Sequence, residues 1–392
     1  MSPGSAAVIA NRTGDLVAAI PPRRYGHQDL VRVLSNGGLD SSFAARARPG
    51  VRTLAVDPQG RILAGIGLEQ ELVVMRFLPD GGIDHDFAED GVATVEVPGT
   101  VGRLEGDQAT FLSVDGFGRV IVGRLKTART SFRHGNGFVV ARLAADGSLD
   151  RTFGDRGLFT AAIQRNTPFS LDSLHVDPAT GKVTVLSTIF EELHGSSSHE
   201  RKRSELVRFL PDGAHDPSFG GGGTVLVTVG RLGTAATAMA VDRHGGIVVG
   251  GTNGRGFGFA RIGSDGRLDP TFGRRGRLIY PVPSPAEAAL DALATDHRGR
   301  VVVAVNAKAR TLPLKGMTAF RLHSTGTLDR SFGEEGFCAA SFPRWNTAAT
   351  TILPQQDSAI LAGLASRPTP GYYPPTAPRL WALAIARCRG SD

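Results

Sequence analysis

The chain has few of the residues that mark several large classes of protein. Its 392 residues include two cysteines, Cys338 and Cys388, which are too few for a disulfide framework and lack the CxxC spacing of a metal site. No run approaches the roughly 18 apolar residues needed to cross a bilayer, and the N-terminal residues lack the basic and apolar segments of a signal peptide. The sequence therefore predicts no disulfide scaffold and no membrane span, and it leaves the redox compartment open.

Tryptophan and tyrosine are also scarce, with two and four copies, which is few for a sugar-binding groove. Glycine and proline are plentiful instead: 51 Gly and 23 Pro accompany a hydrophobic content of 41%. This composition is typical of many short strands joined by tight turns. The net charge is +7, which favours anionic partners, but many of the arginines belong to a repeat, so the net charge overstates any basic surface.

One pattern recurs along the whole chain. It is clearest as FVVARLAADGSLDRTFGDRG at 138–157 and as FARIGSDGRLDPTFGRRG at 259–276. Its arginine occurs seven times, at Arg32, Arg76, Arg142, Arg208, Arg261, Arg321 and Arg387. In the first six copies an aspartate follows eight residues later, at Asp40, Asp84, Asp150, Asp216, Asp269 and Asp329. Three residues further on stands a phenylalanine, at Phe43, Phe87, Phe153, Phe219, Phe272 and Phe332.

A second pattern precedes each arginine, as in LAVDPQGRILAG at 54–65 and LSVDGFGRVIVG at 112–123. Apolar segments flank a turn with Asp first and Gly fourth, the preferences of a type I turn followed by a bulge. An Asp that opens such a turn accepts hydrogen bonds from the next backbone amides. Turn geometry therefore explains Asp57, Asp115, Asp177, Asp242 and Asp296 better than metal binding or acid–base chemistry does.

Each unit thus supplies strand A, a tight turn, strand B, a variable loop, strand C with the arginine, and the DGxLDxxFG link into strand D. Units of this length bury their sheets by stacking on neighbours. We predict an all-β, seven-bladed β-propeller that spans residues 1–392 as a single domain, with mostly four-stranded blades. Only six D strands can be counted, so either one blade is short of a strand or the true start lies upstream of Met1. An open β-solenoid is the alternative.

These units resemble the bacterial delta-60 repeat, a propeller-forming family whose units read LNPDGSLDTSFG preceded by VQPDGKILVGG. The resemblance is carried by FLPDGAHDPSFG at 209–220 and VDPQGRILAG at 56–65, and it covers nearly the whole chain. Asn36 and Thr325 depart from its aspartate, and Ala88 departs from its last glycine. The resemblance implies a bacterial surface or secreted protein without an assigned activity. We expect an extracytoplasmic or secreted protein if the true start lies upstream, and a cytoplasmic one otherwise.

We expect the repeated Arg and Asp to form an ion pair inside each unit that closes the link between strands C and D. Breaking such a desolvated pair by removing one partner costs about 3–5 kcal/mol. The following Phe is expected to fill the interface between blades. A ring of binding charges is the alternative interpretation of the same residues.

Binding residues are expected where the units differ, because function in such scaffolds lies in loops. The B–C segments 124–137, 190–204 and 306–317 are basic, and units 3 and 4 are neighbours. We predict a positive patch there, with solvated loops as the alternative. Its candidate residues are Arg129, Arg133, His134, His194, His199, Arg201, Lys202 and Arg203.

A second candidate surface lies where units 1 and 7 are expected to meet. Tyr25, Tyr372 and Tyr373, together with Arg23, Arg24 and Arg367, could stack on and charge-pair with a ligand or protein. The alternative is a Pro-rich flap that covers the seam. The group Glu191, Glu192, His194, His199 and Glu200 fits no known zinc or calcium spacing, so no metal is predicted.

Two functions remain open. The first is a non-enzymatic, monomeric binding scaffold whose B–C loop face takes an anionic polymer or a protein. The second is an enzyme, a lyase or hydrolase, acting on an acidic polysaccharide, with Arg133, His134, His199 and Arg203 as charge-neutralising and proton-transfer groups. Nucleic-acid binding ranks third because aromatic residues are not interleaved with the basic ones. No cofactor and no catalytic residue set is predicted.

Overall fold

The computed structural model describes residues 7–11, 13–20, 27–68, 71–97, 110–126, 137–162, 169–192, 200–230, 234–253, 256–281, 288–307, 316–342, 346–355, 357–366 and 381–389. The chain divides into two compact units. The first comprises Ile9–Ala19 and Gly26–Thr228, and the second includes Val229–Asp392. Blades 1 to 4 lie in the first unit, apart from Val8, and blades 5 to 7 lie in the second.

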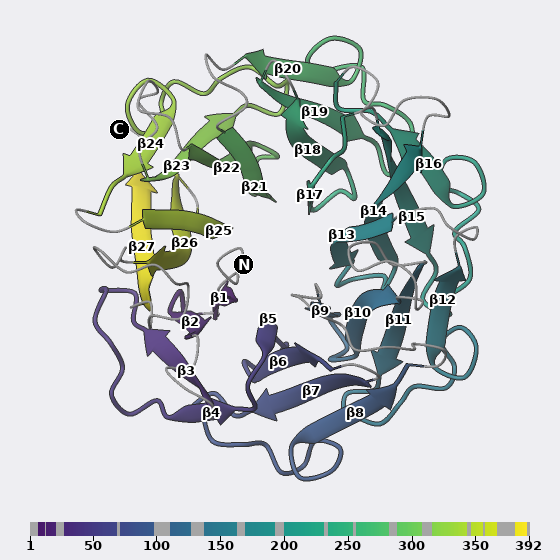
Figure 1. Ribbon diagram of the computed structural model, residues 1–392, viewed down its shortest axis with the longest axis vertical. Helices are drawn as coiled ribbons and strands as arrows, with labels where there is room; N and C mark the ends of the chain where they lie inside the picture. Colours follow the sequence, from purple (N-terminus) through teal and green to yellow (C-terminus); the bar gives the residue numbers. More distant parts are fainter. Residues whose placement is uncertain are drawn as a thin grey trace. The chain divides into compact units, whose positions relative to one another are not determined.

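The blades of the first unit are four antiparallel sheets, each with its strands in chain order (Figure 1). Their strands are β1 (Val8–Ala10), β2 (Leu16–Ala19), β3 (Gln28–Val33) and β4 (Ala45–Ala47) in blade 1, and β5 (Val51–Val56), β6 (Ile62–Gly67), β7 (Glu71–Phe77) and β8 (Val92–Glu96) in blade 2. Blade 3 has β9 (Thr110–Val114), β10 (Val120–Lys126), β11 (Gly137–Leu143) and β12 (Leu158–Ala162), and blade 4 has β13 (Phe169–Val176), β14 (Val183–Glu192), β15 (Glu200–Phe209) and β16 (Thr224–Val227).

The second unit continues the pattern, except in its last blade. Blade 5 has β17 (Ala238–Val241), β18 (Ile247–Asn253), β19 (Gly256–Ile262) and β20 (Arg277–Pro281), and blade 6 has β21 (Ala288–Thr295), β22 (Val301–Ala307), β23 (Gly316–Leu322) and β24 (Phe337–Ala340). Blade 7 has only β25 (Asn346–Pro354), β26 (Ser358–Ser366) and β27 (Trp381–Arg389) among the described residues.

The predicted fold class is confirmed: the chain is an all-β, seven-bladed β-propeller, and the blade short of a strand is the last one. Every described element is a strand, so the described part of the chain offers no helix that could cross a membrane. The core lies between neighbouring sheets. Leu63, Val74 and Phe87 of blade 2, for example, pack with Val122 and Val139 of blade 3.

In five of the repeats an arginine joins its own blade to the next one. In blade 2, Arg76 Nε donates to Asp84 Oδ2 at 2.7 Å, and the guanidinium lies 4.3 Å from the centre of the Phe87 ring. Arg76 Nη1 donates to the carbonyl oxygen of Ala145, which belongs to the link of blade 3. Because Arg76 is only 2% exposed, these contacts form away from water.

We call these contacts of an arginine between two blades a joint. Backbone contacts complete the joint between blades 2 and 3. Ala88 N donates to Asp146 O at 2.7 Å, directly after the carbonyl that Arg76 holds. The next residue, Gly147, has a φ of +90°, and a Cβ there would lie 2.8 Å from the Phe87 ring. The glycine is therefore required both by the backbone conformation and by the close approach of the phenylalanine.

The same joint recurs within both units. All six Arg–Asp pairs of the repeat are formed, and those besides Arg76–Asp84 are Arg32–Asp40, Arg142–Asp150, Arg208–Asp216, Arg261–Asp269 and Arg321–Asp329. Arg32, Arg142 and Arg261 also donate through Nη1 to the link carbonyls of Pro79, Pro211 and Ser324 of the following blades.

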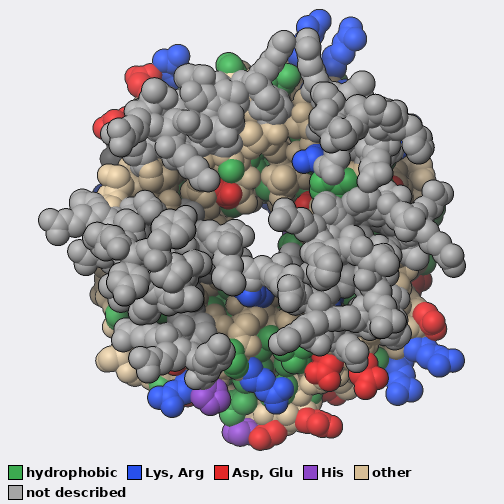
Figure 2. All heavy atoms as spheres, viewed as in Figure 1, with side chains coloured by type: hydrophobic (Ala, Val, Ile, Leu, Met, Phe, Trp, Pro, Cys, Tyr) green, Lys and Arg blue, Asp and Glu red, His purple; other side chains and the backbone are tan. Residues whose placement is uncertain are grey.

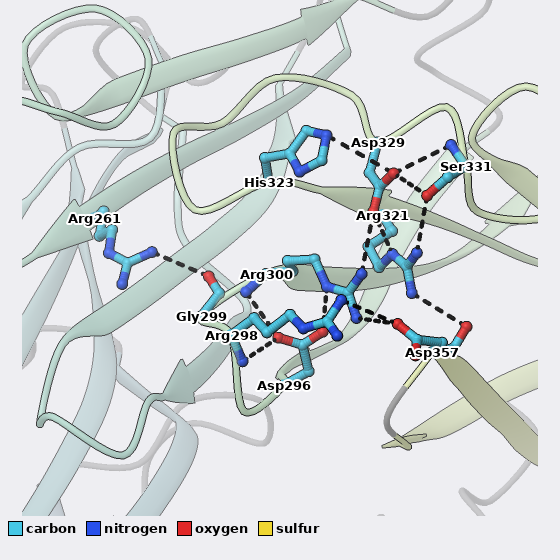
Figure 3. A network of polar contacts seen from close by, with 10 residues as sticks. All are labelled: Arg261, Asp296, Arg298, Gly299, Arg300, Arg321, His323, Asp329, Ser331 and Asp357. Carbon is cyan, nitrogen blue, oxygen red and sulfur yellow. Dashed lines mark hydrogen bonds and ion pairs between the residues drawn. The ribbon is translucent and has the colours of Figure 1, made fainter. Parts of the chain in front are cut away.

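The joint between blades 6 and 7 is different, because the described residues of blade 7 include no link. Figure 3 shows the polar contacts found there. Arg321 Nη1 donates instead to the carbonyl oxygen of Asp357, at 3.4 Å, and the Asp357 carboxylate accepts from Arg298 and Arg300 at 3.3 Å. Gly333 N donates to Arg389 O at 2.8 Å. Backbone and side-chain groups of blade 7 thus take the part that a link plays in the other joints.

A disulfide also crosses this joint. Cys338 of β24 is bonded to Cys388 of β27, which are 50 residues apart in sequence. The prediction that no disulfide holds the fold was wrong, because a disulfide fastens the last blade to its neighbour.

The joint predicts the effect of removing one arginine. Arg142→Ala leaves the Asp150 carboxylate without a cation among the described residues and removes the contact to Pro211. We expect the free energy of unfolding in urea to fall by about 3–5 kcal/mol. Arg267→Ala is the control, because its pair with Asp265 has side chains that are 88% and 57% exposed, and it should change stability by less than about 0.5 kcal/mol. Equal effects of the two variants would contradict this role.

The disulfide predicts a redox-dependent stability. Closing a loop of 50 residues removes chain entropy from the unfolded state, worth up to about 4 kcal/mol. Cys338→Ser should therefore lower the melting temperature, and reductant should lower that of the wild type by a similar amount. Reductant should leave the melting temperature of the variant unchanged. A wild-type protein insensitive to complete reduction would disprove this contribution.

Candidate functional site

Most of the predicted binding residues lie outside the described residues. These are Tyr25, Arg129, Arg133, His134, His194, His199, Tyr372 and Tyr373, together with Arg23, Arg24 and Arg367. The other three, Arg201, Lys202 and Arg203, are consecutive in β15. Successive side chains of a strand alternate between its two faces, so these three residues do not share one face, and the positive patch stays a prediction.

The segment 190–204 is not a loop throughout, as the sequence suggested. Strands β14 and β15 continue into it, and Phe190, Glu191 and Glu192 pair with Lys202, Arg201 and Glu200. The first strand of the blade begins at Phe169, opposite Ile189, and the pairing of the fourth strand ends at Ser204. Residues 190–192 and 200–203 therefore form a two-stranded extension beyond the sheet, which we call the blade 4 arm.

The blade 4 arm carries both signs of charge. Lys202 Nζ lies 5.3 Å from the centre of the Phe190 ring, a cation–π distance. Arg201 stands opposite Glu191 in the ladder, and Glu192 stands opposite Glu200. Figure 2 likewise shows described Lys or Arg and Asp or Glu side chains beside one another at the lower right and upper left, so charge of one sign does not gather there.

Four first strands carry a β-bulge at the same position of the repeat. The register shifts lie between Val51 and Thr53, Leu171 and Ser173, Leu290 and Ala292, and Ala349 and Thr351. The bulged residues are Arg52, Asp172, Asp291 and Thr350, each five residues before the residue that opens the tight turn. Bulges re-aim a side chain and are common next to binding sites, and the first strands of a propeller line its channel.

Asp172 lies in a group of hydroxyls on blade 4. Its Oδ2 accepts from Thr188 Oγ1 at 2.7 Å, and its Oδ1 accepts from Ser170 Oγ at 2.9 Å. The Thr188 hydroxyl lies 3.4 Å from Ser204 Oγ. Burial raises the pKa of Asp172 to about 6, against the two hydroxyl hydrogen bonds that lower it. The carboxyl group can therefore exchange a proton near neutral pH.

Asp291 has the equivalent position on blade 6. Its Oδ2 accepts from Asn306 Nδ2, and the Asn306 Oδ1 accepts from the backbone N–H of Ala349, on blade 7, at 3.0 Å. Burial raises the pKa of Asp291 to about 7, although the side chain is exposed to solvent. The surrounding protein thus desolvates a carboxyl group that water still reaches.

Sequence reasoning missed both carboxylates, although a signal was present. Both sites read LDxLxxD, as Leu171–Asp177 and as Leu290–Asp296, with an aspartate inside an apolar strand. From the sequence we considered the aspartates that open the tight turns instead, and several of these form ion pairs with arginines. Asp57, Asp115 and Asp296 accept from Arg61, Arg119 and Arg300, each four residues later.

One pocket with a volume of about 380 Å³ lies among the tight turns of blades 1 to 4. Asn11, Asp57, Asp115 and Pro178 are among its lining residues. Its two carboxylates already accept from Arg61 and Arg119, so they offer little to a ligand. Over the described ranges no group of three or more His, Cys, Asp or Glu side chains could hold a metal ion. His194 and His199 lie outside those ranges.

Comparisons with known proteins agree with the fold. Residues 129–153 match a family described as a domain of unknown function (DUF5122) with a β-propeller fold. No curated protein matches the chain in sequence. The chain is similar to a solved structure of a protein from Lactobacillus plantarum, with 12% identity, 96% of each chain covered and a TM-score of 0.56.

Two further solved structures are named as lyases. One is a polysaccharide lyase, with 9% identity over 100% of this chain and 91% of that chain, and a TM-score of 0.55. The other is virginiamycin B lyase from Staphylococcus aureus, with 8% identity over 91% of each chain and a TM-score of 0.51. Similarity at such identities shows a shared propeller fold and no shared activity.

The raised pKa of Asp172 predicts a pH-dependent stability. The folded protein binds this proton more tightly than the unfolded chain does, so the contribution to stability is present below about pH 4 and is lost as the pH rises through about 6. Asp172→Asn removes the ionisation. The variant and the wild type should melt alike at pH 4, and the variant should melt higher at pH 8. A difference that does not grow between these pH values would contradict the prediction.

Proposed function

We propose that the protein is a non-enzymatic binding scaffold that presents its B–C loop face to an anionic or extended partner. The proposal is carried by the different roles of two groups of basic residues, the arginines of the repeat and those of the variable segments. The repeat arginines are held between blades by their own aspartates and by link carbonyls. Further basic groups for a partner lie in the variable segments, where residues 124–137, 190–204 and 306–317 are rich in Arg and Lys.

The blade 4 arm supports this proposal. Its strands extend past the described pairing of the first and fourth strands of the sheet. Lys202 is held against Phe190, which limits its freedom before a ligand binds. A partly ordered cationic side chain loses less conformational entropy on binding a sulfate or carboxylate group.

Retention on heparin tests the proposal. We expect the wild type to bind at low salt and to elute at a defined salt concentration, because each cation that contacts the polymer adds to the salt dependence. The double variant Lys202→Ala with Arg203→Ala should elute at clearly lower salt. Arg274→Ala with Arg275→Ala is the matched control, since it removes the same charge from exposed residues of the blade 5 link. If both double variants eluted at equally lowered salt concentrations, the effect would come from net charge, and the blade 4 arm would not be the binding surface.

An enzyme that cleaves an acidic polysaccharide is the second candidate. It is supported by Asp172, whose pKa of about 6 suits proton transfer and whose Oδ2 meets the Thr188 hydroxyl. Two proteins of similar fold are named as lyases. Arg133, His134, His199 and Arg203 keep their proposed roles in charge neutralisation and proton transfer.

Incubation with heparin, alginate, pectate and hyaluronan separates the two functions. New unsaturated or reducing ends, lost in Asp172→Asn while heparin retention is unchanged, would identify an enzyme. Retention without any new ends in all four polymers would leave the binding scaffold.

A further inference from the structure

Asp291 is the single charged residue within a large group of neighbouring strands in the second unit. The first strands β17, β21 and β25 pack side by side, and β18 and β22 lie against them. Their sequences are AMAV, AALDALAT, NTAATTILP, IVVGGTN and VVVAVNA. Asp291 is the one titratable group within these bounds, so no charge on the packed strands compensates it.

The rest of the described structure gives Asp291 no cation either. No Lys, Arg or His among the described residues pairs with it, whereas Asp57, Asp115 and Asp296 each have an arginine. Desolvation without a compensating charge raises its pKa, which means that the ionised form costs folding free energy. An unpaired carboxylate that weakens the fold is typical of a residue kept for binding.

The Asp291 carboxylate is nevertheless held in place. Asn306 Oδ1 accepts from the N–H of Ala349, so its amide group must face the other way and donate to Asp291 Oδ2. Asp291 Oδ1 has no donor among the described residues. The bulge at Asp291 removes the residue from the ladder, and its side chain is exposed to solvent.

We propose that Asp291 anchors a subsite on the first strands of blades 5 to 7 that binds a guanidinium or ammonium group. Such a group donates N–H bonds to Oδ1, which has no donor among the described residues, and supplies the positive charge that the surrounding strands lack. Fixing Oδ2 through Asn306 orients the carboxylate before the ligand arrives. The aliphatic and hydroxyl side chains of the surrounding strands accommodate the alkyl stem of the ligand. This subsite is independent of the basic segments proposed for an anionic partner.

A pair of ligands of the same shape tests the subsite. N-acetyl-arginine amide carries a guanidinium at every pH used, and N-acetyl-citrulline amide is its neutral counterpart. We expect the arginine ligand to bind the wild type at least tenfold more tightly at pH 8.5 than at pH 5.5, because Asp291 must be ionised. The citrulline ligand should bind at least tenfold more weakly at pH 8.5.

Two variants and one spectroscopic measurement complete the test. Asp291→Asn, which can still accept from Asn306, should lose at least tenfold in affinity for the arginine ligand, whereas Asp265→Asn on an exposed link should not. Carbon-13 NMR of labelled Asp carboxyls should show the pKa of Asp291 falling when the arginine ligand saturates the wild type. Any of three results would overturn the proposed subsite. These are an unchanged affinity in Asp291→Asn, equal affinities for the two ligands, and a pKa of Asp291 that does not change when the ligand binds.

Discussion

The arginine between two blades is the interaction on which this propeller depends. One guanidinium meets the aspartate of its own blade, the face of the following phenylalanine and a carbonyl oxygen of the next blade, as Arg76 does with Asp84, Phe87 and Ala145. A lysine could not satisfy all three, because only the planar guanidinium offers several donors and a face for stacking. The joint therefore requires arginine, and it also fixes the spacing to aspartate and phenylalanine. Many of the cations that make the chain basic are structural for this reason.

The joint between blades 6 and 7 contains no link among the described residues, and other contacts hold these two blades together. Blade 7 has three strands among the described residues, and Arg321 donates to Asp357 O in its tight turn and not to a link carbonyl. The carboxylate of Asp357 accepts from Arg298 and Arg300 (Figure 3). The Cys338–Cys388 disulfide joins strands β24 and β27. Because these contacts occur once among the described residues, no repeat pattern in the sequence predicts them. The disulfide links residues from different blades that are 50 positions apart, and spacing alone does not reveal such a pairing.

The fold could be predicted because the motifs that determine it recur along the chain. The six links in the sequence also predicted that one blade could be short of a strand. The candidate site could be predicted only in part. The turn-like residues HGSSSH span only 194–199, and the strands continue on both sides of them because Phe190 and Lys202 pair across the ladder. Asp172 and Asp291 were missed because a polar residue in an apolar first strand is visible in sequence, whereas the bulge that turns it out of the ladder is not.

Charge is used in opposite ways in the joints and at the bulges. Joint aspartates are surrounded by donors, and Asp216, with Lys182 and Arg208 beside it, has a pKa well below its usual range through its hydrogen bonds and ion pairs, despite burial. Burial instead raises the pKa values of Asp172 and Asp291, and neither has a cation among the described residues. The joints repeated between the blades of each unit stabilise the folded chain. The ionised carboxylates of Asp172 and Asp291 lower this stability, but not enough to unfold the sheets. Sites for ligands can therefore form on the first strands of this scaffold, where no joint is needed.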